Sequence, residues 1–300
     1  MADRVIFTDV GPRDGLQNQP KILTVEERLR LVGALVEAGV RSIEVGSFVS
    51  PKAVPAMAGT DQVVAGLPAG DGVSYSALIP NMKGYELARD AGVRTVNMVL
   101  YASEGMAQKN VGMTMAQAEE ATRKILDCAR DDGVSVIAAV ATAFCCPFDG
   151  PTDPGVVKDI VARFIDSGLE QLVLADTIGA AHPQQVRALA DDLVAQHGAQ
   201  RIGCHFHDTR AMGLANVFAA LESGVRNFDG SVAGLGGCPF APGASGNVAT
   251  EDVVMMLHQM GFSTGIDLAA LLRASALAEQ FTGADTGGGA RRWLKTRLQH

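Results

Sequence analysis

Two histidines separated by a single residue are the first sign of chemistry in this sequence. His205 and His207 lie in the run R-I-G-C-H-F-H-D, where an apolar start leads into the two imidazoles and then Asp208. In an extended strand, alternate side chains point to the same face, so both rings should point the same way. Two imidazole nitrogens at the end of a strand make half of a divalent-metal site, and the other half has to come from elsewhere in the chain.

A polar run near the N-terminus is a source for the missing ligands. Asp14 lies in D-V-G-P-R-D-G-L-Q, directly after the apolar segment 5–10. Carboxylate and amide oxygens combined with imidazoles suit a divalent cation such as Mg2+ or Mn2+, with open positions for water or substrate. A single buried histidine is more often an ordinary core residue. Two at this spacing, facing an aspartate, favour the metal site.

Arg13 and Glu44 each allow two interpretations. Arg13 is either half of an ion pair that holds its loop or a cation placed where negative charge develops on a carbonyl oxygen, and we favour the second. Glu44 lies in the otherwise apolar run 42–48, where an unpaired buried carboxylate would be costly. We therefore expect Glu44 to belong to a buried network with Arg13 rather than to an exposed rim.

Cys238 lies in the run G-L-G-G-C-P-F-A-P-G-A-S-G-N, whose glycine content is typical of a mobile lid. It is either a small buried filler or a group that transfers protons above a metal site. The adjacent Cys145 and Cys146 are interpreted as packing residues. No lysine stands in the loop directly after the segment 171–175, which argues against a Schiff-base aldolase mechanism.

The elements that position these residues alternate between strand-like and helix-like segments. We expect strands at 5–10, 42–48, 74–79, 95–101, 134–143, 171–175, 202–207 and 227–232, and helices at 25–38, 84–90, 116–131, 154–167, 183–196, 213–223 and 249–260, with a short helix ending near Gly66 and a loop at 103–112. Five helices end in a shared signal, E-A-G-V-R, D-A-G-V-R, D-D-G-V-S, D-S-G-L-E and E-S-G-V-R. Each places a glycine at the helix end and the next strand directly after it. This repetition predicts an α/β fold, a closed (β/α)8 TIM barrel with a short C-terminal helical extension.

A TIM barrel gathers its active site at the carboxyl ends of the strands. The polar residues expected there are Asp9, Arg13, Asp14, Glu44, Ser47, Asn97, Asp176, Thr177, His205, His207, Asp208, Cys238 and Asn247. Only the eighth strand separates the first from the seventh around the ring, so Asp14 and the histidine pair should converge. An open doubly wound sheet is the alternative fold, but no G-x-G-x-x-G follows the first strand.

Size and composition narrow the class of protein further. The 300 residues, 47% hydrophobic and 19% charged, predict one catalytic domain over 1–281 and a flexible tail over 282–300. A net charge of −8 argues against a nucleic-acid partner. The longest apolar run, 134–146, is shorter than the roughly 20 residues that span a bilayer. No signal segment opens the sequence and the five cysteines show no zinc spacing, so we expect free thiols in the cytoplasm.

Four longer motifs carry a family resemblance. D-V-G-P-R-D-G-L-Q-N, S-I-E-V-G-S-F-V-S-P-K-A-V-P-A-M, C-H-F-H-D-T and G-G-C-P-F-A-P-G-A-S-G-N-V-A-T-E-D together resemble the family of 3-hydroxy-3-methylglutaryl-CoA lyases. The resemblance extends from about Arg4 to Gly261, and the cysteine run is its most specific part. It implies a metal-dependent retro-Claisen lyase acting on an acyl-CoA, an assembly of two or more copies, and a place in leucine degradation and ketone-body formation.

The resemblance also assigns roles to individual residues. It implies that four side chains bind the cation, Mg2+ or Mn2+: Asp14, His205, His207 and Asn247. It implies that Arg13 stabilises the enolate of the departing acetyl-CoA and that Cys238, from its loop, assists proton transfer. Glu44 and Asp176 would support the network that faces the substrate, and His205 is a second candidate for the general base.

Two departures from the family pattern concern the acyl group. Arg210 follows H-D-T where an aromatic residue is common, and Phe148 stands where tyrosine is usual. We therefore expect 3-hydroxy-3-methylglutaryl-CoA or a relative with a different C3 substituent. A Claisen-type acyltransferase, condensing acetyl-CoA with a 2-oxo acid, is the second hypothesis. A catalytically silent barrel is the third, although all four expected ligands are present.

Overall fold

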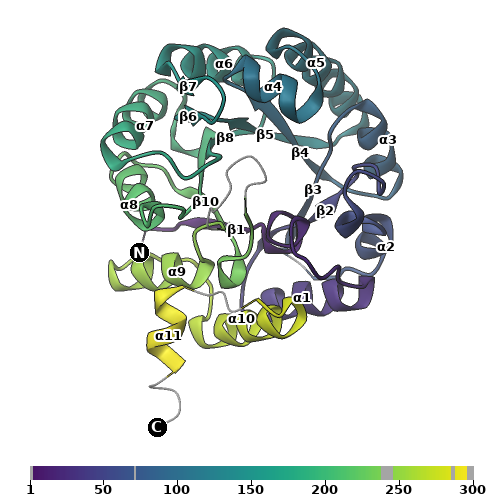
Figure 1. The fold of residues 1–300 in the computed structure, drawn as a ribbon, viewed down its shortest axis with the longest axis vertical. Helices are drawn as coiled ribbons and strands as arrows, with labels where there is room; N and C mark the ends of the chain where they lie inside the picture. The colour runs from purple at the N-terminus through teal and green to yellow at the C-terminus, as the bar shows by residue number, and fades with distance from the viewer. Residues whose placement is uncertain (1–2, 71, 238–245, 285–287, 296–300) are drawn as a thin grey trace.

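A computed structural model describes residues 3–70, 72–237, 246–284 and 288–295. Within these residues, eight parallel strands close into a barrel in the order β1-β10-β9-β8-β5-β4-β3-β2 (Figure 1). The strands are β1 Ile6–Asp9, β2 Ser42–Ser47, β3 Ser74–Leu78, β4 Thr95–Tyr101, β5 Ser135–Ala141, β8 Gln171–Asp176, β9 Ile202–Phe206 and β10 Asn227–Gly230. The predicted TIM barrel is confirmed, and β10 separates β1 from β9 as the sequence indicates.

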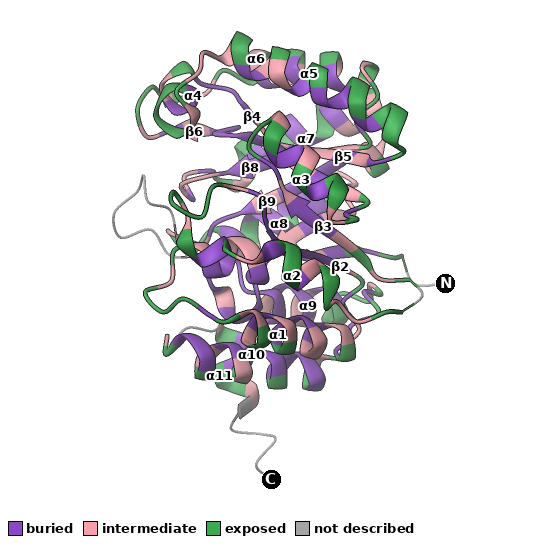
Figure 2. Cartoon of the chain, turned by 90° about the vertical axis from the view of Figure 1, so that its right-hand side faces the viewer, coloured by how far each residue is buried: buried purple, intermediate pink, exposed green. Residues whose placement is uncertain are grey.

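Helices alternate with the strands and surround the barrel (Figure 1). They are α1 Val25–Glu37, α2 Thr60–Ala65, α3 Met82–Asp90, α5 Met115–Asp132, α6 Pro154–Asp166, α7 Pro183–His197, α8 Gly213–Glu222 and α9 Thr250–Gln259. Buried residues form the barrel and the inner faces of these helices, whereas exposed residues gather on their outer faces (Figure 2). This one-sided burial gives each helix its place around the sheet.

The repeated glycine at the helix ends has the conformation that the sequence predicts. Gly39, Gly92, Gly133, Gly168 and Gly224 have φ angles of 91°, 88°, 66°, 97° and 94°. Residues other than glycine rarely adopt this left-handed backbone conformation. The glycines therefore end the helices and return the chain to the barrel at five of the junctions.

Two segments between strands differ from the prediction. The expected loop 103–112 contains helix α4, Glu104–Val111, which Ser103 caps at its start and Gly112 ends with a φ of 67°. The chain after β5 forms a small antiparallel hairpin, β6 Cys145–Cys146 and β7 Gly150–Pro151. The Ser103 hydroxyl lies within hydrogen-bonding distance of both the Cys146 thiol and the Asp149 carboxylate. These contacts hold the hairpin and α4 together beside the barrel.

Two further helices follow the barrel. α10, Leu268–Thr282, packs against α1 and α9, and α11, Gly289–Lys295, packs against α9 (Figure 1). Asp252 of α9 accepts hydrogen bonds from the amides of Gly289 and Ala290. The C-terminal helical extension is thus confirmed, and part of the segment expected to be a flexible tail is a helix. The division at residue 281 stays a prediction.

No helix in the described ranges is long and apolar enough to cross a membrane.

Candidate active site

A tight turn after β1 places Arg13 and Asp14 at the mouth of the barrel. The sequence predicts a turn-rich loop here, and residues Gly11–Gly15 form one turn of π-helix, η1. A Cβ added to Gly11 would lie 2.7 Å from the Asp9 carboxylate, and one added to Gly15 would lie 2.7 Å from the Ser231 hydroxyl. Both glycines are therefore needed for the turn to pack this closely against the chain after β10.

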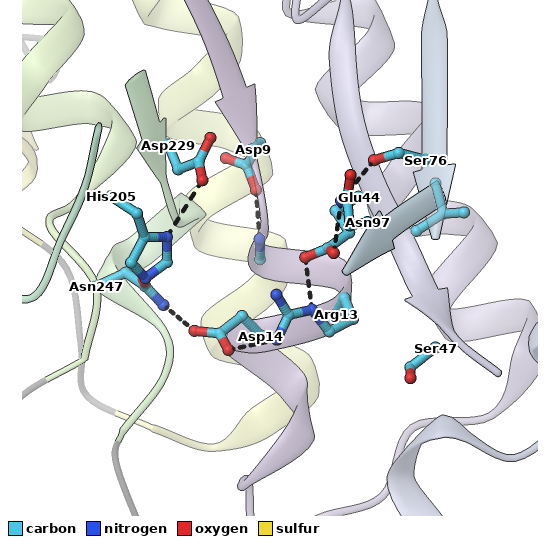
Figure 3. A network of polar contacts seen from close by, with 12 residues as sticks. Asp9, Arg13, Asp14, Glu44, Ser47, Ser76, Asn97, His205, Asp229 and Asn247 are labelled. Atoms are coloured by element: carbon cyan, nitrogen blue, oxygen red, sulfur yellow. Dashed lines mark hydrogen bonds and ion pairs between the residues drawn. The ribbon is translucent and has the colours of Figure 1, made fainter. Parts of the chain in front are cut away.

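Arg13 lies between two carboxylates. Its Nε donates to Glu44 Oε2 at 2.5 Å and its Nη1 donates to Asp14 Oδ1 at 2.6 Å (Figure 3). The other Glu44 oxygen accepts a hydrogen bond from Asn97, whose amide also reaches Ser76. Glu44 is only 1% exposed, so the expected buried network with Arg13 is confirmed. The same contacts fix the guanidinium in place.

Burial and neighbouring charges act in opposite directions on the pKa values of this network. Burial raises the pKa of Glu44, and Arg13 offsets only part of that rise. For Asp14 the balance is reversed, because Arg13 and the two histidines outweigh burial and lower its pKa to about 2. Asp14 is therefore ionised at neutral pH, as a metal ligand must be.

The side chains of Asp14, His205 and His207 converge as the sequence predicts. Each offers a ligand atom, and these atoms lie within 4.8 Å of one another. The closest approach of His207 to Asp14 is 4.0 Å, from Nε2 to Oδ2, and the two rings have centroids 5.2 Å apart. Burial and the neighbouring His205 lower the pKa of His207 to about 4, so its ring is neutral near pH 7. A neutral imidazole can bind a cation.

Asn247 completes a donor set that fits a divalent cation. It lies beside His207 through an isolated antiparallel bridge, and its Nδ2 donates to Asp14 Oδ2 at 2.7 Å and to the Leu235 carbonyl at 3.1 Å. Its Oδ1 is buried and has no hydrogen-bond partner among the described residues. A buried amide oxygen rarely stays unpaired. An oxygen-preferring cation between Asn247, Asp14 and the histidines would satisfy it.

Asp229 is a residue of the site that sequence reasoning missed. It lies on β10, and its Oδ2 is 3.3 Å from Nδ1 of His205 (Figure 3). Burial alone would lower the pKa of His205, but Asp229 raises it above its ordinary value. The segment N-F-D-G gave no motif, and only the alignment of β10 with β9 reveals that Asp229 faces the histidine.

Asp9 and Asp176 are held apart from the Arg13 network. The Asp176 oxygens accept hydrogen bonds from the amides of Ala180 and Ala181, and burial raises the pKa of this carboxyl despite them. Asp9 accepts hydrogen bonds from the Gly11 amide and the Thr250 hydroxyl.

Cys238 and Ser47 are two other residues that the sequence predicts at the site. Cys238 lies outside the described residues. Ser47 is buried near the mouth, and its hydroxyl has no hydrogen-bond partner in the described chain (Figure 3).

A parallel barrel whose strand ends gather carboxylates, imidazoles and a fixed arginine belongs to the class of TIM-barrel enzymes. A family model described as HMGL-like matches residues 4–278, and the chain belongs to that family.

Its relatives include lyases of two names. The chain is 46% identical over 263 residues to a hydroxymethylglutaryl-CoA lyase of Pseudomonas mevalonii, covering 88% of this chain and 87% of the relative. It is 44% identical over 284 residues to an (R)-citramalyl-CoA lyase of Chloroflexus aurantiacus, covering 91% and 89%. A solved HMG-CoA lyase of Acinetobacter baumannii, in complex with coenzyme A and 3-methylmalate, superposes with a TM-score of 0.93 at 38% identity, covering 97% of this chain and 95% of that one.

Proposed function

We propose that this protein is a divalent-metal-dependent carbon–carbon lyase. It cleaves 3-hydroxy-3-methylglutaryl-CoA, or a close 3-hydroxy-3-carboxymethyl acyl-CoA, to acetyl-CoA and acetoacetate or the analogous 3-oxo acid. One observation carries the proposal: Asp14, His205 and His207 converge within 4.8 Å beside a fixed arginine at the barrel mouth. The chain is also 46% identical to the hydroxymethylglutaryl-CoA lyase of Pseudomonas mevalonii.

The cation, Mg2+ or Mn2+, would be held by Asp14, His205, His207 and Asn247. The unpaired Asn247 oxygen and the ionised Asp14 support this assignment. Once bound, a divalent cation supplies Lewis acidity that lowers the pKa of a coordinated hydroxyl group.

Bond cleavage begins when a base takes the proton of the substrate's C3 hydroxyl. The bond between C2 and C3 then breaks, its electron pair moves to C2, and C3 becomes the carbonyl carbon of the 3-oxo acid. The enolate of the acetyl thioester takes up a proton at C2 and leaves as acetyl-CoA. His205 and Cys238 are the two candidates for the base.

Arg13 stabilises the thioester enolate. Its Nε and Nη1 are engaged by Glu44 and Asp14, so the guanidinium is positioned before substrate arrives and its remaining N–H groups can donate to the oxyanion. Glu44 serves by orienting Arg13. Asp176, the last residue of β8, supports the site and accepts hydrogen bonds from amides of the loop that follows.

The scope of the acyl group remains a prediction. The citramalyl-CoA lyase relative supports assays on acyl groups shorter than hydroxymethylglutaryl. Of the two departures from the family pattern, Phe148 is 44% exposed, and Arg210 donates from Nε to the Gly179 carbonyl at 3.0 Å and from Nη2 to that of Ala180.

The relatives named above are lyases, which favours cleavage over the condensation catalysed by Claisen-type acyltransferases. Coenzyme A is bound in the solved structure of the Acinetobacter baumannii relative, which supports an acyl-CoA as the substrate of this protein. Cytoplasmic location, assembly of two or more copies, and a role in leucine degradation or ketone-body formation stay predictions.

An acetyl-CoA release assay tests the proposal. The purified protein is incubated with 3-hydroxy-3-methylglutaryl-CoA and with citramalyl-CoA, each with Mg2+, Mn2+ or a chelator, and separately with acetyl-CoA plus a 2-oxo acid. We expect metal-dependent release of acetyl-CoA from at least one hydroxyacyl thioester, and no condensation that releases free CoA. Condensation without cleavage would overturn the proposed direction.

A further inference from the structure

Within the described residues, the carboxylate of Asp229 has one hydrogen-bonding partner, the ring of His205. The two residues are aligned in the register of the parallel strands β10 and β9, so both side chains face the same side of the sheet. Asp229 Oδ2 lies 3.3 Å from His205 Nδ1, and both side chains are mostly buried (Figure 3). In the described part of the chain, the Asp229 carboxylate makes no other hydrogen bond. Its contact with His205 is therefore the feature to explain.

The contact determines which nitrogen of His205 is available. A carboxylate oxygen at this distance is a hydrogen-bond acceptor, so the tautomer that makes the contact carries its proton on Nδ1. The lone pair of a neutral ring then resides on Nε2, which is the nitrogen left for a cation. Histidines that bind metals commonly donate their second N–H to such a carboxylate.

His207 offers a contrast within the same site. Its Nε2 approaches Asp14, and its buried Nδ1 has no carboxylate partner within the described chain; the backbone of Thr177, and not an acid, lies beside the ring. One of the two histidines is thus oriented by a carboxylate while the other is not. A loss of the carboxylate should therefore act through His205 alone.

We propose that Asp229 is a positioning residue that fixes the ring and the tautomer of His205 for binding the divalent cation. The inference rests on the proposed metal role of His205. If Nε2 held the cation while Nδ1 donated to Asp229, His205 would have no nitrogen left to take the substrate's proton.

Binding of Mn2+ to the metal-depleted protein, measured by titration calorimetry, tests the proposal without substrate. Asp229→Ala should weaken binding about 10–100-fold. Asp229→Asn should weaken it less, because an amide oxygen can still accept from Nδ1. Thr8→Val is the matched control, since Thr8 is aligned beside Asp229 but bonds Ser42, and it should change the affinity by less than about threefold.

A double-mutant cycle separates positioning from a general loss of negative charge. In a His205→Ala background, Asp229→Ala should weaken Mn2+ binding by less than about threefold, because the ring it acts on is gone. Equal losses in both backgrounds, or an Asp229→Ala protein that binds Mn2+ as tightly as the unaltered one, would overturn the proposal. Thermal unfolding of each metal-depleted variant verifies that it is folded. If Asp229→Ala does not fold, the Mn2+ affinity of Asp229→Asn tests the proposal in its place.

The outcome is independent of the acyl-CoA assay. If Mn2+ binding follows this pattern but no thioester is cleaved, the proposed lyase activity fails and the role of Asp229 stands. If the unaltered protein cleaves substrate and Asp229→Ala leaves the Mn2+ affinity unchanged, the proposed lyase activity stands and the role of Asp229 fails.

Discussion

Replacing Arg13 with methionine removes one charge from the mouth of the barrel while keeping most of the side-chain volume. The guanidinium is held by Glu44 and Asp14 at 2.5 and 2.6 Å, so it needs no rearrangement to face a developing oxyanion. A preorganised donor of this kind is worth about 3–4 kcal/mol in the transition state. We therefore expect Arg13→Met to lower kcat at least about a hundredfold.

The same substitution also affects folding. Arg13→Met leaves Glu44, which is 1% exposed, without its cationic partner. Breaking a buried pair in this way costs about 3 kcal/mol of stability, less whatever the Glu44 carboxyl regains by taking up a proton. Stability and turnover have to be measured separately, since both are expected to fall.

The assay is acetyl-CoA release at saturating substrate and Mn2+, at a temperature where circular dichroism shows the variant to be folded. Glu44→Gln is the companion variant, because it disturbs the same network but keeps the guanidinium. It should retain more turnover than Arg13→Met at comparable loss of stability. An Arg13→Met protein that keeps more than about a tenth of the original kcat would remove arginine from the mechanism.

Three further substitutions test separate parts of the account. Asn247→Ala removes the unpaired amide oxygen and should weaken Mn2+ binding at least about tenfold in a calorimetric titration; unchanged affinity would exclude it as a ligand. Burial raises the pKa of Asp9 from 3.8 to about 7, so the folded state holds a proton that the unfolded chain releases, and stability falls as the pH rises through that window. Asp9→Asn should abolish this fall, so urea unfolding should show it gaining stability relative to the parent between about pH 4 and pH 7, and parallel pH profiles would contradict the assignment. Gly11→Ala places a Cβ 2.7 Å from the Asp9 carboxylate and 2.8 Å from Val232, and should lower the free energy of unfolding by about 1–3 kcal/mol; an unchanged denaturation midpoint would show that the turn has room.

The barrel was predictable because each repeat carries its own local signals. The glycine after each of five helices needs a left-handed conformation, and the structure has it at all five, from Gly39 to Gly224. Helix α4 was missed although Ser103 and Gly112 bound it, because Gly105 and Asn110 lower the helical propensity of so short a segment. The π-helical turn at Gly11–Gly15 has no periodic pattern, and packing against the chain after β10 determines it.

The site was predictable where strand position alone decides proximity. Asp14, His205 and His207 lie at or just after the carboxyl ends of β1 and β9, which only β10 separates, and the buried pairing of Glu44 with Arg13 follows from the cost of an isolated carboxylate. Asp229 could not be found in this way. Whether it faces the barrel interior or the helices depends on strand register, which a one-residue shift would reverse.

A crystal structure of the protein soaked with Mn2+, with the cation located by anomalous scattering, tests the central claim most directly. We expect one strong peak at the barrel mouth, within coordination distance of Asp14, His205, His207 and the Asn247 oxygen. A fully soaked crystal with no peak there, or with Mn2+ bound only elsewhere, would contradict it.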